Sequence, residues 1–190
     1  MALISLGFGA ILVSNVLLSQ FLGICSFIGV STQKKNAIGM SFAVIFVLVL
    51  ASVVTWCIYH FLLIPLGINY LDQIVSILVI ATLVQFVEMF LKKFIPKLYE
   101  ALGIYLPLIT TNCAILGVAT TNIQNNYSFI EAVVYAVCIG VGYLLVMFIF
   151  SSIREKIEVA PVPKYFKGIP VAFVLAGVMA LAFYGFGGIF

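Results

Sequence analysis

Two of the four cysteines in this 190-residue chain stand in matching sequence contexts, and thiols are the side chains here best suited to metal chemistry. Residues 25–32, which begin with Cys25, align with residues 113–120, which begin with Cys113, and four of the eight positions are identical. Paired thiolates in a site shielded from water suit soft metals, iron–sulfur clusters above all. A [2Fe–2S] cluster normally takes four cysteines, so this pair needs two further ligands from a partner protein.

The other two cysteines, Cys57 and Cys138, are expected to behave as small buried hydrophobic residues. No pair among the four has CxxC spacing, which leaves an ordinary zinc site or a thioredoxin-like motif without support. All four lie within apolar segments rather than in outer-side loops, so structural disulfides are not expected.

The composition places these cysteines in a membrane. Hydrophobic residues make up 65% of the chain and charged residues 8%, against about 25% charged in a typical soluble domain. The mean hydropathy is +1.30, more apolar surface than a chain of this length can bury in one core. A water-soluble fold and disorder are therefore excluded. The net charge of +3 is too small to indicate nucleic-acid binding.

Charged and polar residues divide the chain into six apolar segments, each about as long as a transmembrane helix or longer. The segments are residues 2–33, 36–71, 72 to the charged cluster that ends at Glu100, 101–123, 129–153 and 168–190. We expect a single all-α transmembrane domain, 1–190, whose halves of about 1–97 and 98–190 hold three spans each. Because three is an odd number, the second half must cross in the opposite direction, which predicts a 3+3 inverted repeat.

Both cysteine-bearing segments carry signals of a broken helix. A continuous helix over residues 2–33 would be about 48 Å long, against about 30 Å of hydrocarbon, and Gly23 and Gly29 flank the cysteine. In the fourth segment Pro107 and the polar run 110–112 precede the second cysteine. Irregular backbone inside a membrane is tolerated only where protein or a cavity covers it. The pattern predicts that spans one and four break near the membrane midplane.

Few other polar residues are candidates for function, and no catalytic residue is expected. Thr111 and Asn112 are placed to donate hydrogen bonds to cluster sulfur, although helix–helix hydrogen bonding is the commoner role of such residues. Among the carboxylates, Asp72 and Glu131 open helices, and Glu88 lies four residues before a lysine. These three carboxylates keep an ion-path role open, and His60 is expected at the outer membrane interface.

Three stretches resemble the A subunit of the Rnf complex, and the resemblance covers essentially the whole chain. They are QFLGICSFIGVS at 20–31, YLPLITTNCAILG at 105–117 and QFVEM at 85–89. The resemblance implies a membrane component of an ion-translocating ferredoxin:NAD oxidoreductase, a redox-driven translocase with no complete active site in this chain. It further implies that Cys25 and Cys113, with two cysteines of a homologous E subunit of opposite orientation, hold a [2Fe–2S] cluster that relays electrons across the bilayer.

The same resemblance implies a bacterial or archaeal cytoplasmic membrane, Na⁺ or H⁺ as the coupling ion, and further Rnf subunits that carry flavins and iron–sulfur clusters. Cys57 and Cys138 match no ligand motif. The E subunit of the sodium-pumping NADH:quinone oxidoreductase is the nearest alternative, although residues 110–118 favour the Rnf member. A secondary transporter with inverted repeats is a more distant alternative, because the segments lack a clearly central charged residue.

The positive-inside rule gives a testable orientation. All nine Lys and Arg residues lie in or beside the loops after the first, third and fifth segments, which predicts that those loops are cytoplasmic and that both termini face outward. We expect single cysteines at Lys34, Lys97 and Lys164, on a background without native cysteines, to be labelled only from the cytoplasmic side. Labelling near Lys97 from the outer side alone would show the orientation to be reversed.

Overall fold

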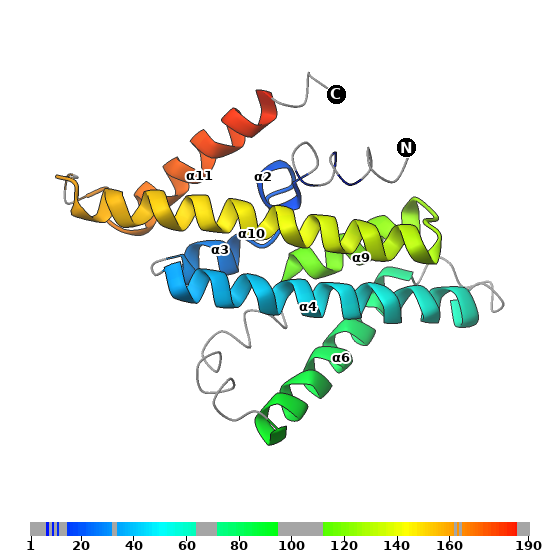
Figure 1. Ribbon diagram of the computed structural model, residues 1–190. Helices are drawn as coiled ribbons and strands as arrows, with labels where there is room; N and C mark the ends of the chain where they lie inside the picture. Colours follow the sequence, from blue (N-terminus) through cyan, green and yellow to red (C-terminus); the bar gives the residue numbers. More distant parts are fainter. Residues whose placement is uncertain are drawn as a thin grey trace.

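The computed structural model describes residues 7, 9, 11, 15–31, 34–63, 72–94, 112–161, 163 and 165–185 (Figure 1). The regular elements of these residues are all helices. They are α2 (Val16–Ser19), α3 (Ile24–Val30), α4 (Lys34–Ile58), the π-helical turn η2 (Tyr59–Leu63), α6 (Asp72–Phe94), α9 (Cys113–Gln124), α10 (Phe129–Val159) and α11 (Ile169–Tyr184).

Helices α4 and α10 form the frame of the molecule, running side by side in opposite directions (Figure 1). Within the described residues, two helical stretches are long and apolar enough to cross a membrane: Asn36–Phe61 and Phe129–Val159. Two further apolar helical stretches, Ile74–Met89 and Ile169–Tyr184, are shorter. The described part of the chain is thus helical and holds two helices of membrane-spanning length, and the expected number of six spans stays a prediction.

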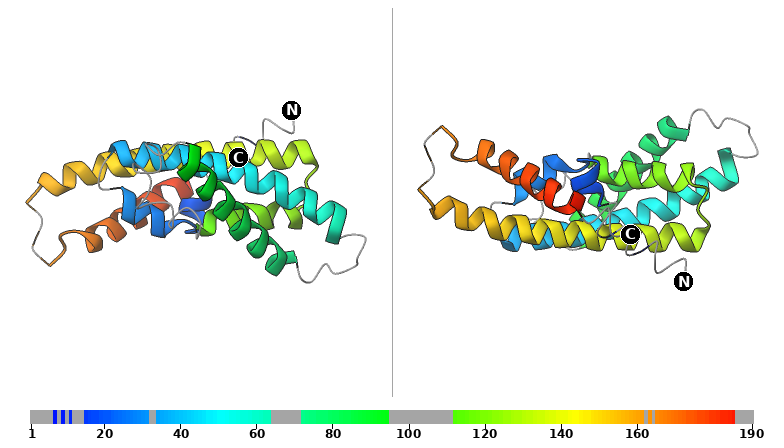
Figure 2. Two further views of the ribbon diagram at one scale, coloured as in Figure 1. Left: turned by 90° about the horizontal axis from the view of Figure 1, so that it is seen from below. Right: turned by 90° about the horizontal axis from the view of Figure 1, so that it is seen from above.

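Two short helices lie against this frame, α3 along one half and α9 along the other, with their N-terminal ends toward its middle (Figures 1 and 2). The first apolar segment is interrupted, because α2 ends at Ser19 and α3 begins at Ile24. Phe21 and Gly23 between them have positive φ angles of 54° and 88°. The segment that precedes α9, including Pro107, lies outside the described residues. On the frame side, the Phe27 ring of α3 packs on Phe150 of α10, with ring centroids 3.9 Å apart.

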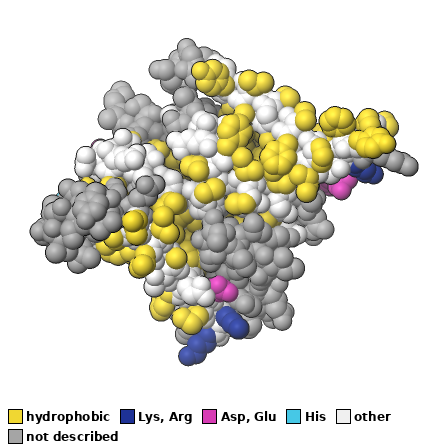
Figure 3. Space-filling model, turned by 180° about the vertical axis from the view of Figure 1, so that it is seen from behind, with side chains coloured by type: hydrophobic (Ala, Val, Ile, Leu, Met, Phe, Trp, Pro, Cys, Tyr) yellow, Lys and Arg dark blue, Asp and Glu magenta, His cyan; other side chains and the backbone are white. Residues whose placement is uncertain are grey.

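Helices α6 and α11 flank the frame on opposite sides: α6 crosses in front when the molecule is seen from below, and α11 when it is seen from above (Figure 2). Both expose large apolar side chains, such as Leu78 and Phe86 on α6 and Leu181 on α11. Figure 3 shows hydrophobic side chains over much of one face and charged side chains gathered at two edges. Apolar surface this extensive suits contact with lipid or with neighbouring proteins.

At one end of the frame, charged side chains tie α3, α4 and α10 together. Arg154 of α10 donates from Nη1 to the carbonyl oxygen of Ile28 at 2.6 Å and to the Ser31 hydroxyl at 2.7 Å. Lys34 pairs with Glu155 at 2.8 Å. Carbonyl groups at a helix C-terminus have no hydrogen-bond donor within the helix. Arg154 supplies such a donor to the C-terminal end of α3.

At the other end, aromatic side chains join α4 to the connection between α9 and α10. Trp56 donates from Nε1 to the carbonyl oxygen of Tyr127 at 2.9 Å and stacks on the exposed His60, with ring centroids 4.9 Å apart. Aromatic rings of this kind are typical of membrane–water interfaces. Ser128 and Glu131 form a capping box that starts α10, which confirms the expectation that this carboxylate opens a helix.

Arg154 offers a test of what holds α3 in place. We expect Arg154→Leu, measured in the assembled membrane complex, to speed amide hydrogen exchange in residues 24–31 by about tenfold or more. The reason is that hydrogen bonds to a charged group contribute about 2 kcal/mol and here fix the C-terminus of α3. Lys156→Leu, the same change at an exposed site on the same helix, should leave the exchange unchanged. Equal acceleration in the two variants would contradict this role of Arg154.

Candidate metal centre

The structure brings together the two cysteines that the sequence singled out. Cys25 lies in the first turn of α3 and Cys113 is the first residue of α9. Their side chains lie close enough to interact with each other, although 88 residues separate them in the chain. Cys25 is exposed and Cys113 is partly buried. Two sulfur atoms therefore converge from two helices at one point of the surface.

Gly23 makes this approach possible. Its backbone N–H donates to Sγ of Cys113 at 2.9 Å, so the backbone just before α3 binds the sulfur at the start of α9. Its φ of +88° is unfavourable for residues with a Cβ, and an added Cβ would lie 3.2 Å from Oδ1 of Asn112 and 3.4 Å from Cβ of Ala114. Glycine is thus required here by the backbone conformation and by the close approach of α9.

The backbone presents the positive ends of peptide dipoles to the Cys113 sulfur. Cys113 occupies the N-terminal position of the twelve-residue α9, where free N–H groups and the helix dipole stabilise negative charge. The Gly23 N–H adds one donor from a different segment. Both contributions lower the cost of holding a negative sulfur ligand in apolar surroundings.

A buried polar network lies directly beside the sulfur pair. The Ser26 hydroxyl donates to the carbonyl oxygen of Gly23 at 2.8 Å, which leaves its oxygen to accept from the Tyr143 hydroxyl at 2.9 Å and from Nδ2 of Asn112 at 3.4 Å. Oδ1 of Asn112 in turn accepts from the N–H of Ala114 at 3.1 Å and caps α9. The network therefore locks α3, α9 and α10 to one another.

Sequence reasoning missed Ser26 and Tyr143. A signal was present, because a tyrosine within an apolar span needs a partner for its hydroxyl, but its partner is 117 residues away in the chain. The amide of Asn112 is engaged with Ser26 and Ala114, so its expected hydrogen bond to cluster sulfur stays a prediction. Thr111 lies outside the described residues.

The remaining cysteines have different surroundings. Cys138, on α10, packs against a cluster of buried hydrophobic residues. Gly7 lies close to it, since a Cβ added to Gly7 would be 3.1 Å from the Cys138 sulfur. Cys57 is half-buried on α4. In the described part of the chain, no three His, Cys, Asp or Glu side chains come together. Cys25 and Cys113 accordingly offer two soft sulfur ligands, which fits half of the ligand set of a [2Fe–2S] cluster.

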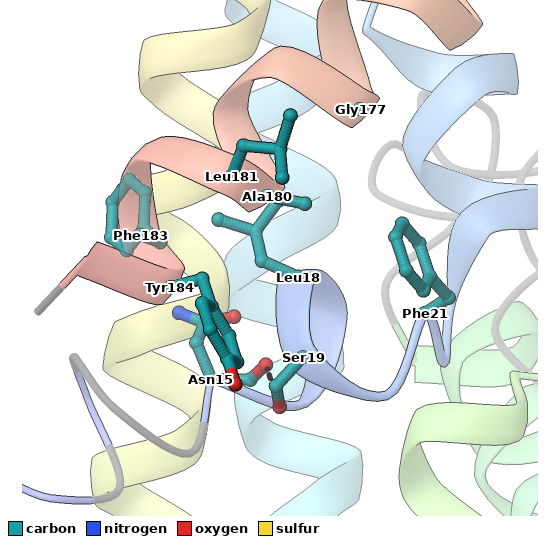
Figure 4. Close-up of a pocket in the computed structure, with 9 residues that line it drawn as sticks. All are labelled: Asn15, Leu18, Ser19, Phe21, Gly177, Ala180, Leu181, Phe183 and Tyr184. Carbon is teal, nitrogen blue, oxygen red and sulfur yellow. Dashed lines mark hydrogen bonds between the residues drawn. The ribbon is translucent and has the colours of Figure 1, made fainter. Parts of the chain in front are cut away.

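An apolar groove of about 320 Å³ adjoins the break before α3 (Figure 4). Its walls come from α2 and its flanks on one side and from α11 on the other. In Figure 4, Phe21 stands on one side of the groove and Leu181 on the other. The groove puts an apolar boundary next to the segment that carries Gly23.

Comparison with known proteins identifies the family of this chain. Residues 3–190 match the protein family described as "Rnf-Nqr subunit, membrane protein". The chain is 53% identical over 188 residues to the A subunit of a Na⁺-translocating ferredoxin:NAD⁺ oxidoreductase complex from Acetobacterium woodii, covering 99% of this chain and 98% of that protein.

Two further relatives are each named as the A subunit of an ion-translocating oxidoreductase complex. The protein from Syntrophotalea carbinolica is 50% identical and that from Vibrio cholerae 52%, each over 181 residues that cover 95% of this chain and 94% of the relative. The resemblance to the A subunit of the Rnf complex is thereby confirmed, and the chain belongs to the Rnf-Nqr family of membrane subunits.

Proposed function

We propose that this chain, as a subunit of an ion-translocating ferredoxin:NAD oxidoreductase, supplies Cys25 and Cys113 as two of the four ligands of an intramembrane [2Fe–2S] cluster. When bound, such a cluster supplies one-electron transfer. The observation that carries the proposal is the contact between these two thiols at the N-termini of two helices far apart in the chain. The coupling ion is proposed to be Na⁺, in keeping with the name of the relative from Acetobacterium woodii.

The other two ligands are proposed to come from the homologous E subunit, inserted in the opposite direction. The exposure of Cys25 supports this arrangement, because a partner can approach the sulfur pair from that side. Burial of the pair between two subunits would also remove water from the site. A charged cluster is stable in a membrane without water only if protein groups replace its lost hydration.

An inverted repeat with broken spans one and four is part of the proposal. Its support is the order of the helices: α3, α4 and α6 follow one another as short, long and flanking helices, and so do α9, α10 and α11 (Figure 1). The C-terminal end of α3 is anchored from α10 by Arg154, and the turn that follows α9 is anchored from α4 by Trp56. A pseudo-two-fold axis between the two halves would produce such corresponding contacts in each half.

The chain's own residues position and insulate the site. Gly23 donates its N–H to the Cys113 sulfur, and the network of Ser26, Tyr143 and Asn112 fixes the two helix starts relative to each other. A ligand pair held this rigidly needs little reorganisation when the charge at the site changes. The role proposed for this chain is therefore to hold a relay point, while NAD, ferredoxin and flavins are bound by other subunits.

Substitution of each cysteine separates ligands from packing residues. In the assembled complex, Cys25→Ser and Cys113→Ser should each abolish the paramagnetic resonance signal of the membrane cluster and stop ferredoxin-linked NAD reduction. A serine hydroxyl is a poor substitute for a thiolate toward iron. Cys57→Ser and Cys138→Ser are the matched controls, because they make the same change within helices and should keep the signal.

Assembly of the complex, quantified alongside the resonance spectra, separates loss of the cluster from loss of the complex. A normal signal in assembled Cys25→Ser and Cys113→Ser complexes, with loss in Cys57→Ser, would show the ligand assignment to be wrong.

Co-production tests whether the site is shared. The isolated chain should lack a normal [2Fe–2S] signal because it supplies two ligands, and co-production with the E subunit should give one cluster per pair of subunits. Iron and acid-labile sulfide per protein chain, together with the resonance spectrum, measure this. A complete cluster recovered from the single chain, with no homodimer present, would refute a shared site.

A further inference from the structure

A second polar site lies at the end of the frame opposite Arg154, where α4, α9 and α10 meet. That end of the frame is on the right in Figure 1. A cavity of about 450 Å³ opens there. We call it the Asn122 cavity. Its lining residues are Trp56, Tyr59, His60, Asn122, Ile123, Asn126, Tyr127, Ser128, Phe129 and Glu131. The lining includes one carboxylate and neither Lys nor Arg, so the charge at its mouth is negative when His60 is neutral.

Asn122 supplies a buried oxygen that lacks a partner. Its side chain is 4% exposed, and Nδ2 donates to the Ser52 hydroxyl of α4. Within the described part of the chain, Oδ1 has no hydrogen-bond partner. A buried acceptor without a partner is costly, and a native structure that keeps one commonly binds an ion or water there.

A second such oxygen lies on α4, one turn beyond Ser52. Thr55 is 4% exposed, and among the described residues its Oγ1 also has no hydrogen-bond partner. Thr55 and Ser76 of α6 line a small cavity that shares Tyr59 and Ile123 with the Asn122 cavity. The polar atoms thus continue from the mouth of the larger cavity into the packing between α4, α6 and α9.

Glu131 stands at the rim and keeps a defined position. Its Oε2 accepts from the backbone N–H and from the hydroxyl of Ser128, both at 2.9 Å, within the capping box of α10. These hydrogen bonds stabilise the ionised carboxylate. A fixed negative charge at the mouth and neutral oxygens deeper inside are the donors that a hard monovalent cation prefers, since such cations take oxygen ligands.

We propose that the Asn122 cavity binds the coupling Na⁺ ion, with Glu131 attracting the ion to the mouth and Oδ1 of Asn122 serving as a buried ligand. This inference rests on the proposed ion-translocating function and assigns it a site. It is independent of the sulfur pair, because none of the cavity's lining residues belongs to the network around Cys25 and Cys113.

The test measures ferredoxin-linked NAD reduction by the purified intact complex while NaCl is exchanged for choline chloride at constant ionic strength. Asn122→Leu should raise the half-saturating Na⁺ concentration about tenfold, because a buried ligand is lost. Glu131→Gln should raise it about threefold, because the charge is lost while glutamine preserves the capping box. Glu158→Gln, an exposed carboxylate at the far end of the same helix, should leave it unchanged.

The resonance signal of the cluster should stay at the wild-type value in the Asn122 and Glu131 variants. The proposal is overturned if the wild-type rate does not depend on Na⁺, if both variants keep the wild-type half-saturation, or if Glu158→Gln shifts it as far as Glu131→Gln does. Should Asn122→Leu fail to assemble, Glu131→Gln against Glu158→Gln decides alone. Failure of the cluster assignment is distinguishable, because it appears in the resonance signal rather than in the Na⁺ dependence.

Discussion

The hydrogen bond from the Gly23 N–H to the Cys113 sulfur is the contact on which the rest of the structure depends. It exists only because two helices begin inside the protein, and a free backbone N–H in apolar surroundings is costly unless it finds an acceptor. The sulfur of Cys113, at the start of α9, is that acceptor. The interruption between α2 and α3 and the placement of Cys113 are therefore linked. The break leaves the Gly23 N–H without an acceptor in its own helix, and the Cys113 sulfur accepts its hydrogen bond.

The remaining elements hold α3 and α9 in place, because helices this short are not stable alone. The α4–α10 pair provides a long apolar support, and Phe27 packs on Phe150 within it. Arg154 closes the C-terminus of α3, while Trp56 holds the turn that follows α9. Each short helix is thus fixed at the end remote from its cysteine, which leaves the two N-termini to meet at the sulfur pair.

The sequence allowed some of this to be predicted because the relevant signals are local. Gly23 marked the interruption, the repeated octapeptide marked both cysteines, and Glu131 marked the start of α10. The Ser26–Tyr143 hydrogen bond and the contact of Arg154 with Ile28 join residues 117 and 126 positions apart, so no local pattern reveals them. The unpaired oxygens of Thr55 and Asn122 became visible only once packing showed which polar atoms lack partners among the described residues.

The most direct test of a cluster held by Cys25 and Cys113 is alkylation of the intact complex, read residue by residue by mass spectrometry before and after removal of iron with a chelator. Both thiols should be protected at first and should become reactive together, along with two cysteines of the partner protein. The reactivity of Cys57 and Cys138 should not respond to the chelator. Alkylation of Cys25 or Cys113 in the iron-loaded complex, or protection of Cys57 that depends on iron, would contradict the assignment.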